Sequence, residues 1–225
     1  MNQTKLWEDK GKYWHLKVKQ GMIDCEKARF GRCQSTLNDG ESYFGESKED
    51  LALYATGLKT KIFNERAKSV MKIGTEDEPK AREWYQKYYE FEVEEMGLCV
   101  PKFNLNIGTS IDGKIKNQNG IIEIKCPVYM YKELKEYIQN KQNKNGFSHI
   151  KPYHYKQMQF SMGCLGADFC DYIVFSRDGK RFVQRIIFDK VFWDEMYKRT
   201  VIFWEEYIKP LIEEHKIKII YPPEK

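Results

Sequence analysis

Apolar residues recur at helical spacing in the first half of the chain. Over residues 48–73 they predict a helix with one apolar face, formed by Leu51, Leu53, Tyr54, Leu58, Ile62 and Phe63. Gly74 and Thr75 are expected to break this helix, and a second helix is predicted from about 76 to 92. Thr75 and Glu78 fit a capping box at the start of that second helix.

The period changes in the middle of the chain. Residues 98–110 and 121–126 are predicted to be strands joined by a turn rich in asparagine and glycine. Further elements are expected along the rest of the chain: helices at 129–140 and 152–165, a hairpin at 171–188 around Asp178-Gly179, and a long aromatic helix at 189–214 that Pro210 bends or ends. Helices on either side of a run of strands predict an α/β fold with a central sheet covered on both faces.

The pattern indicates a single domain over residues 1–225, without a repeat or a clear boundary. Residues 1–35 are expected to form an N-terminal arm anchored by aromatic side chains. Residues 98–188 would form the sheet core, and 189–214 the C-terminal helix.

Composition narrows the class of protein. The net charge of +5, from 38 basic and 33 acidic residues, is compatible with a polyanionic partner but does not establish one. The six cysteines form no C-x-x-C pair, so zinc and iron–sulfur spacing is absent. The first residues form no apolar leader, and no stretch approaches the length of a membrane span. We therefore expect an intracellular protein that does not cross a membrane.

The candidate chemistry lies on the strand Ile121 to Cys126. Side chains alternate along a strand, so Glu123 and Lys125 share one face, while Asp112 lies at hairpin distance before them. Two carboxylates are suitable ligands for Mg²⁺, and the backbone carbonyl of Ile124 can add a third oxygen. Lys125 can stabilise charge on a phosphoryl group, or act as a base if the site lowers its pKa.

Two simpler explanations stand beside this one. Glu-x-Lys on a strand is common as an exposed ion pair, and Asp-Gly is common as a turn. The apolar strand favours the site, because unpaired charge beside it is costly without a metal or a partner.

The residues also resemble a known family. Asp112-Gly113 with Glu123-Ile124-Lys125-Cys126-Pro127 is similar to the PD-(D/E)xK nuclease core, and more narrowly to the phage lambda-type exonuclease (viral recombinase) family. Three other blocks match in the same order along residues 29 to about 165: Arg29-Phe30-Gly31 with Ser35-Thr36, Gly74 to Arg82, and Tyr155 to Met162. The chain departs from the family pattern at Ile111, where proline is usual, and at His154, where tyrosine is common.

The resemblance implies a PD-(D/E)xK fold and a Mg²⁺-dependent deoxyribonuclease, with two metal ions and with Mn²⁺ able to substitute. It would digest linear double-stranded DNA from 5′ ends and leave 3′ single strands for recombination. The implied partners are DNA ends and a single-strand annealing protein, and the implied assembly is a trimeric ring. The implied location is the cytoplasm of a bacterium or of a phage- or virus-infected cell.

The implied residue roles follow the matched blocks. Asp112, Glu123 and the Ile124 carbonyl would hold metal, Lys125, Glu78 and Gln157 would support catalysis, and the 5′-phosphate would be bound by Arg29, Ser35 and Thr36.

Several alternatives stay open at this point. Glu78 is either a site carboxylate or only part of a helix cap, and Gln157 is either a site residue or a satisfied buried amide. The basic loop 141–149 either follows a phosphate backbone or is simply solvated. Another PD-(D/E)xK nuclease, such as an endonuclease or junction resolvase, and a non-catalytic DNA-binding scaffold both remain in view.

Overall fold

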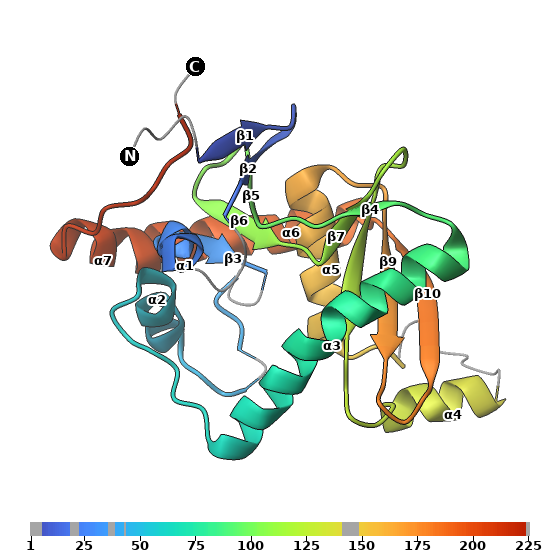
Figure 1. Ribbon diagram of the computed structural model, residues 1–225. Coiled ribbons are helices and arrows are strands. Elements are labelled where there is room, and N and C mark those ends of the chain that lie inside the picture. Colours follow the sequence, from blue (N-terminus) through green and yellow to red (C-terminus); the bar gives the residue numbers. More distant parts are fainter. Residues whose placement is uncertain (1–5, 19–22, 36–38, 43, 141–148, 224–225) are drawn as a thin grey trace.

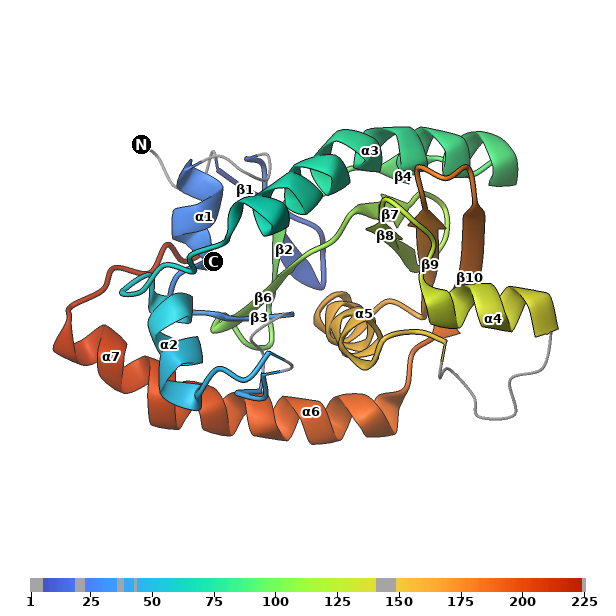
Figure 2. The same cartoon turned by 90° about the horizontal axis from the view of Figure 1, so that it is seen from below.

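The strands divide between two five-stranded sheets. Helix α5 (Pro152–Leu165) lies between the sheets, and α3 (Glu65–Tyr89) and α6 (Lys190–Phe203) run along opposite sides (Figures 1 and 2). The computed structural model describes residues 6–18, 23–35, 39–42, 44–140 and 149–223. The α/β fold with helices flanking its sheets is therefore confirmed. The strands form two sheets because residues 98–110 are not one strand: the chain turns within 102–106 and folds back on itself.

The first sheet has the order β1-β2-β5-β6-β3. Its members are β1 (Trp7–Asp9), β2 (Tyr13–Leu16), β5 (Leu98–Pro101), β6 (Ile107–Ser110) and β3 (Cys33–Gln34). β3 pairs with β6 in parallel, and the other pairs are antiparallel. The pairing of β2 with β5 places the first described residues inside a sheet, with Trp7 and Leu16 buried.

The second sheet has the order β10-β9-β8-β7-β4. Its members are β10 (Arg181–Ile187), β9 (Phe169–Phe175), β8 (Gly120–Lys125), β7 (Gly113–Ile115) and β4 (Val93–Glu94). β8 and β9 are parallel, and the other pairs are antiparallel. The predicted hairpin is confirmed as β9 and β10, with Gly179 in the left-handed region (φ 83°) that a tight turn requires.

The side chains of β8 alternate between two faces of the sheet, and each face packs against a different helix. Ile122 and Ile124 pack with Ala81 and Tyr85 of α3 (Glu65–Tyr89) in one apolar cluster. Ile121 belongs to the main core, which also holds Met158 of α5 (Pro152–Leu165). Glu123 and Lys125 therefore extend on the face that is covered by α5.

The predicted helix break at Gly74 and Thr75 is wrong. The break lies earlier: α2 (Lys48–Thr56) ends at Gly57, and Asn64 caps α3 by accepting a hydrogen bond from the N–H of Ala67. Gly74 sits in open space within α3, and its penalty of about 1 kcal/mol relative to alanine is too small to end a long helix. The Thr75 hydroxyl donates to the Met71 carbonyl, so Thr75 does not cap a helix and the capping-box interpretation of Glu78 is wrong.

Four other helices surround the sheets in the described part of the chain. They are α1 (Ile23–Arg29), α4 (Lys132–Asn140), α6 (Lys190–Phe203) and α7 (Lys209–Glu214). A π-helical turn, Trp204–Ile208, joins α6 to α7 just before Pro210. Proline has no N–H for the normal α-helical bond, and the wider turn bonds the N–H of Lys209 to the Trp204 carbonyl instead.

The part of the chain that the structure describes contains no helix long and apolar enough to cross a membrane. Most of the basic loop 141–149 lies outside the described residues.

Candidate active site

Lys125, at the end of β8, connects two of the predicted site residues. Its ammonium donates to Glu123 Oε1 at 2.5 Å and to Gln157 Oε1 at 3.2 Å. Glu123 is buried, with 2% of its surface exposed, whereas Lys125 is partly open to solvent. The strand places the first two side chains on one face, and the first turns of α5 bring Gln157 to the same place.

Asp112 lies in the bend between β6 and β7. Its Oδ2 accepts a hydrogen bond from the backbone N–H of Ile124 at 2.6 Å, which fixes the carboxylate against the middle of β8. Its backbone carbonyl accepts from Arg82 Nε of α3 at 2.9 Å. Two elements thus hold Asp112 beside Glu123 and Lys125.

Arg82 is a residue whose bridging role the sequence interpretation missed. Besides the Asp112 carbonyl, its guanidinium contacts Glu78 at 2.6 Å and Glu95 at 3.2 Å. Glu78 and Arg82 are four residues apart on one helix, a spacing that already favours an ion pair. The contact with Asp112, thirty positions further on, depends on the tertiary fold.

The site holds more negative charge than its cations neutralise. Burial and the neighbouring Glu123 carboxylate raise the pKa of Asp112 to about 7. Burial and the Asp112 carboxylate likewise raise the pKa of Glu78 to about 7, against the opposing effect of Arg82. Burial alone would lower the pKa of Lys125, but Glu123 and Asp112 outweigh it and the pKa is raised. Lys125 is therefore a cation, and the alternative of a neutral lysine base is disfavoured.

The donor set suits a hard divalent cation. Asp112 and Glu123 are carboxylates that repel one another, as the raised pKa of Asp112 shows, and a bound cation would relieve that repulsion. The described residues contain no group of three or more His, Cys, Asp and Glu side chains placed to hold a metal by themselves. A metal here would need the backbone carbonyl of Ile124 and ligands from the substrate or water.

Arg29, at the end of α1, lies next to this site. It donates from Nη2 to the Ser110 hydroxyl at 2.7 Å, and Ser110 is two residues before Asp112. The Nε–H of Arg29 is buried and has no hydrogen-bond partner among the described residues. A partly buried guanidinium with a buried, unused Nε–H favours an anion at this position.

The other two predicted phosphate ligands are less defined. Ser35 is half-buried beyond β3, and Thr36 lies outside the described residues. Ser110, which the structure joins to Arg29, was not among the predicted phosphate ligands. The only sequence signal for it was its place at the head of the Ser-Ile-Asp-Gly block.

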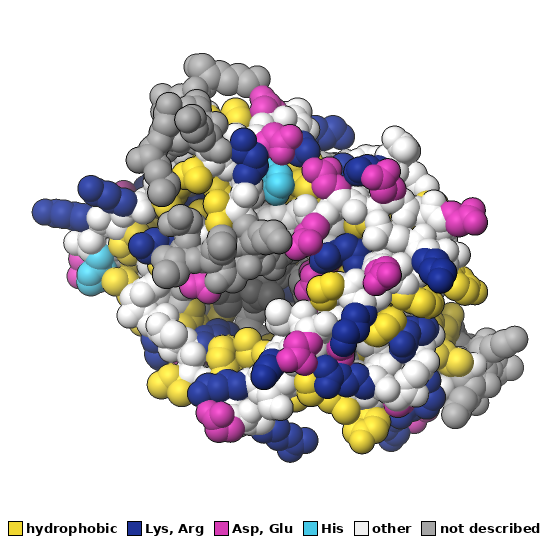
Figure 3. Space-filling view, in the orientation of Figure 1, with side chains coloured by type: hydrophobic (Ala, Val, Ile, Leu, Met, Phe, Trp, Pro, Cys, Tyr) yellow, Lys and Arg dark blue, Asp and Glu magenta, His cyan; other side chains and the backbone are white. Residues whose placement is uncertain are grey.

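Charge on the surface adds little to this picture. Over the described part of the face seen in Figure 3, Lys and Arg side chains are interspersed with Asp and Glu. This face therefore does not identify a partner by its charge, and the chemistry must be argued from the site itself.

A mixed sheet that presents Asp112, Glu123 and Lys125 together, between helices that supply Glu78 and Gln157, defines the nuclease core of the PD-(D/E)xK type. The model of the YqaJ-like viral recombinase domain matches residues 3–168. The chain belongs to this family, and the resemblance that its sequence predicted is confirmed.

Solved structures give the same result. An alkaline exonuclease (LHK-Exo) from Laribacter hongkongensis superposes with a TM-score of 0.67 at 27% identity, over 87% of this chain and 96% of that one. The same enzyme in complex with dAMP gives 0.64 at 26% identity, over 87% and 98%. A phage-related exonuclease from Haemophilus somnus 129PT shares the fold, with a TM-score of 0.53 at 17% identity over 89% and 97%. No match is found among curated proteins.

Proposed function

We propose that this protein is a Mg²⁺-dependent exodeoxyribonuclease that digests linear double-stranded DNA from 5′ ends and leaves 3′ single strands. The observation that carries the proposal is the contact of Lys125 with both Glu123 and Gln157, with Asp112 fixed on the N–H of Ile124. Family membership and the exonuclease neighbours support it.

Asp112, Glu123 and the Ile124 carbonyl are the groups that would hold the metal. When bound, a divalent cation would polarise the phosphoryl group and make a water more acidic. We propose Mg²⁺, with two ions during catalysis and Mn²⁺ able to substitute, because these ligands are hard oxygens.

The other site residues are proposed to stabilise charge, orient the lysine and exchange a proton. Lys125 is charged and faces the same space as Glu123, so it can stabilise the extra negative charge of the phosphoryl group during in-line attack. Gln157 fixes the direction of the Lys125 ammonium through its side-chain oxygen. Glu78, with a pKa near 7, can accept or release a proton at working pH or add a carboxylate to the metal site.

The proposed polarity rests on Arg29. Its partly buried guanidinium, bonded to Ser110 and with a buried Nε–H that has no partner among the described residues, is placed to bind a terminal 5′-phosphate beside the proposed catalytic carboxylates. Ser35 and Thr36 would complete the pocket, as the resemblance implies.

The same proposal extends to partners. The substrate is the end of a DNA duplex, and the product strand would pass to a protein that anneals single strands. A ring-shaped homotrimer would keep the enzyme on its substrate. We expect it to act on DNA in the cytoplasm of a bacterium or of a phage- or virus-infected cell.

Two other functions remain as outcomes of a test. An endonuclease or junction resolvase could use the same carboxylates but would not need the phosphate-binding arginine. A non-catalytic scaffold would have no use for a carboxylate whose pKa is raised by another buried carboxylate, since that arrangement costs stability.

The test uses two substrates. The protein is incubated with Mg²⁺ and either 5′-labelled linear duplex or closed circular duplex, beside Lys125→Ala. Progressive release of mononucleotides from the linear duplex alone, lost in Lys125→Ala, supports the exonuclease. Nicking of the circle would indicate an endonuclease, and binding without cleavage would overturn the enzymatic proposal.

A further inference from the structure

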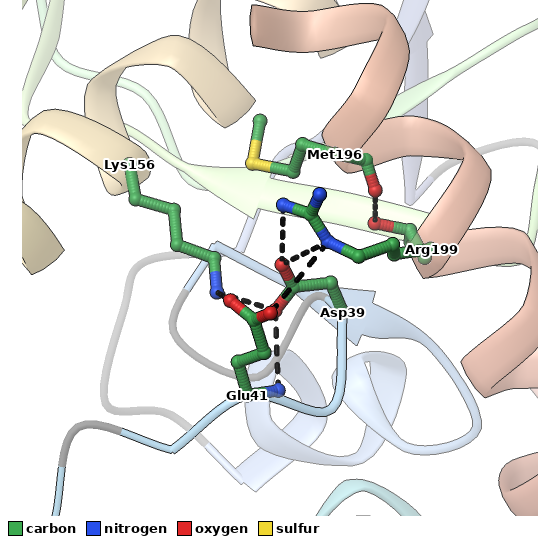
Figure 4. A network of polar contacts seen from close by, with 6 residues as sticks. Asp39, Glu41, Lys156, Met196 and Arg199 are labelled. Carbon is green, nitrogen blue, oxygen red and sulfur yellow. Dashed lines mark hydrogen bonds and ion pairs between the residues drawn. The ribbon is translucent and has the colours of Figure 1, made fainter.

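A second cluster of charged side chains lies where the segment around Asp39 meets α5 and α6. The Asp39 carboxylate is fully buried between Lys156 of α5, which donates to it, and Arg199 of α6, whose guanidinium is 3.3 Å away (Figure 4). Glu41 lies at the edge, 3.6 Å from Lys156 and 3.8 Å from Arg199. We call Asp39, Glu41, Lys156 and Arg199 the positioning cluster.

The segment that carries Asp39 is held in one place by packing as well as by charge. Gly40 has a φ of 71°, and a side chain there would collide with the buried ring of Phe203 on α6. The N–H of Glu41 donates to Asp39 Oδ1 at 3.2 Å. Two carboxylates and two cations balance one another. Only the Asp39–Lys156 pair is buried on both sides, and a buried salt bridge is weak evidence for added stability, so a role in fixing geometry is the better hypothesis.

Each side of the cluster leads to a part of the proposed site. Lys156 directly precedes Gln157, whose oxygen accepts from Lys125. Asp39 lies four residues after Ser35, in the segment that leaves β3, and β3 pairs with β6, which ends at Ser110. The contact between Asp39 and Lys156 therefore ties the segment proposed to bind the 5′-phosphate to the helix that orients the catalytic lysine.

We propose that the positioning cluster couples recognition of the DNA end to catalysis, by fixing the described residues 29–35 and 39–41 relative to Gln157 and Lys125. In this proposal the four side chains are positioning residues that act through the residues beside them. The inference rests on the proposed function, because it assumes that Arg29 and its neighbours read a 5′-phosphate.

The experiment compares kcat/KM on linear duplexes that carry either a 5′-phosphate or a 5′-hydroxyl. The main variant is the double change Asp39→Asn with Lys156→Met, which removes both charges together and so leaves no buried ion without a partner. Lys156→Arg keeps the charge and serves as the conservative variant. Asp171→Asn alters another buried ion pair, with Arg185, away from residues 29–41 and is the matched control.

The double variant should lose about tenfold or more of the preference for 5′-phosphorylated ends, mostly through KM, as when a positioning contact is removed. Lys156→Arg should keep most of the preference, and Asp171→Asn should keep all of it even if its melting temperature falls. If the double variant does not fold, Arg199→Gln replaces it. Arg199 is 43% exposed, so its loss should cost less folding free energy. We then expect a smaller fall in the preference for 5′-phosphorylated ends.

The outcomes separate the two proposals. A folded double variant, or Arg199→Gln in its place, that discriminates between the two ends as well as the unaltered protein overturns the coupling role alone. Failure of the unaltered protein to digest linear duplex, or to prefer 5′-phosphorylated ends, overturns the function proposed above and this inference with it.

Discussion

Asp112, in the bend just before β7, and Asp171, on β9, are carboxylates beside the same strand β8, and their surroundings are opposite. Asp171, on β9 opposite Ile122 of β8, receives two hydrogen bonds from Arg185, at 2.8 and 2.9 Å, and one from the Tyr85 hydroxyl at 2.5 Å. Among the described residues, the Asp112 side chain receives one hydrogen bond, from the N–H of Ile124, and faces a second carboxylate.

The difference distinguishes a carboxylate that holds the fold from one that we propose binds a cation. A buried carboxylate with enough donors is satisfied and contributes to packing. A carboxylate kept beside another acid, with its pKa raised to about 7, destabilises the free protein and gains from a bound cation. Each prediction below uses Asp171, or another matched residue, to break or sharpen this contrast.

The largest effect is expected from Glu123→Gln. Losing this carboxylate removes a proposed metal ligand and the partner of Lys125, so kcat on linear duplex should fall about 100-fold or more. Asp171→Asn, equally buried, should keep kcat close to that of the unaltered protein. Steady-state nucleotide release measures both. Similar losses in the two variants would mean that the fall in rate reflects damage to the sheet and not loss of a site residue.

Asp112→Asn should stabilise the metal-free protein. A carboxyl whose pKa is raised from 3.8 to about 7 on folding weakens the fold once it is ionised, so the penalty is absent below about pH 4 and grows until about pH 7. At pH 8 the variant should gain about 2–4 kcal/mol in free energy of unfolding, and the gain should vanish near pH 4.

Mg²⁺ provides the second half of that test. It should raise the melting temperature of the unaltered protein, because a ligand that binds the folded state stabilises it by about 2.7 kcal/mol at 100 times Kd. The melting temperature of Asp112→Asn should not respond to Mg²⁺. Asp171→Asn should be less stable by about 1–3 kcal/mol and still respond to Mg²⁺. Denaturant unfolding at several pH values, with and without Mg²⁺, separates these outcomes. A Mg²⁺ response in Asp112→Asn would place the metal elsewhere.

Arg29→Gln should affect the choice of DNA end. Loss of a charged hydrogen-bond donor predicts a fall of about 10- to 100-fold in kcat/KM on 5′-phosphorylated duplex, with little change on 5′-hydroxyl duplex. Lys27→Gln removes an exposed charge from the same helix and should leave the preference intact. If both variants lose activity on both substrates equally, Arg29 acts through general attraction to DNA.

The smallest effect is expected from Arg82→Lys. Lysine keeps the charge but cannot contact the Asp112 carbonyl, Glu78 and Glu95 together. Asp112 and Glu78 should then be less well placed, and kcat should fall about tenfold. Arg177→Lys, at another ion pair that involves α3, is the matched control and should change kcat little. An unchanged rate in Arg82→Lys would show that Asp112 needs only its contact with Ile124.

Much of the site could be predicted because its spacing is local. Alternation along one strand places Glu123 and Lys125 on one face, and Pro152 with Gly166 marks the bounds of α5 and hence the place of Gln157. Residues far apart in the chain were harder to connect. Neither the Arg82 contact with Asp112 nor the burial of Asp39 against Lys156 leaves a pattern in the sequence, because each depends on how the sheets pack.

Local signals also failed where packing outweighed them. Gly74 resembles a helix break, but its penalty of about 1 kcal/mol is small beside the packing of Ala81 and Tyr85 of the same helix against β8. Glu78 therefore lies in mid-helix, near Asp112, instead of in a cap. The split into two sheets depends on the turn within 102–106, which lies inside a stretch that looks like one long strand.

The most direct test of the central claim is the order of nucleotide release from one duplex. A linear substrate with a 5′-phosphate carries one label at the 5′ end of a strand and a second at its 3′ end, and is mixed with Mg²⁺ and either the unaltered protein or Lys125→Ala. We expect the 5′ label to appear first as a mononucleotide, the 3′ label to remain on a shrinking strand, and neither to be released by Lys125→Ala. Earlier release of the 3′ label, internal fragments, or equal digestion by Lys125→Ala would contradict the account.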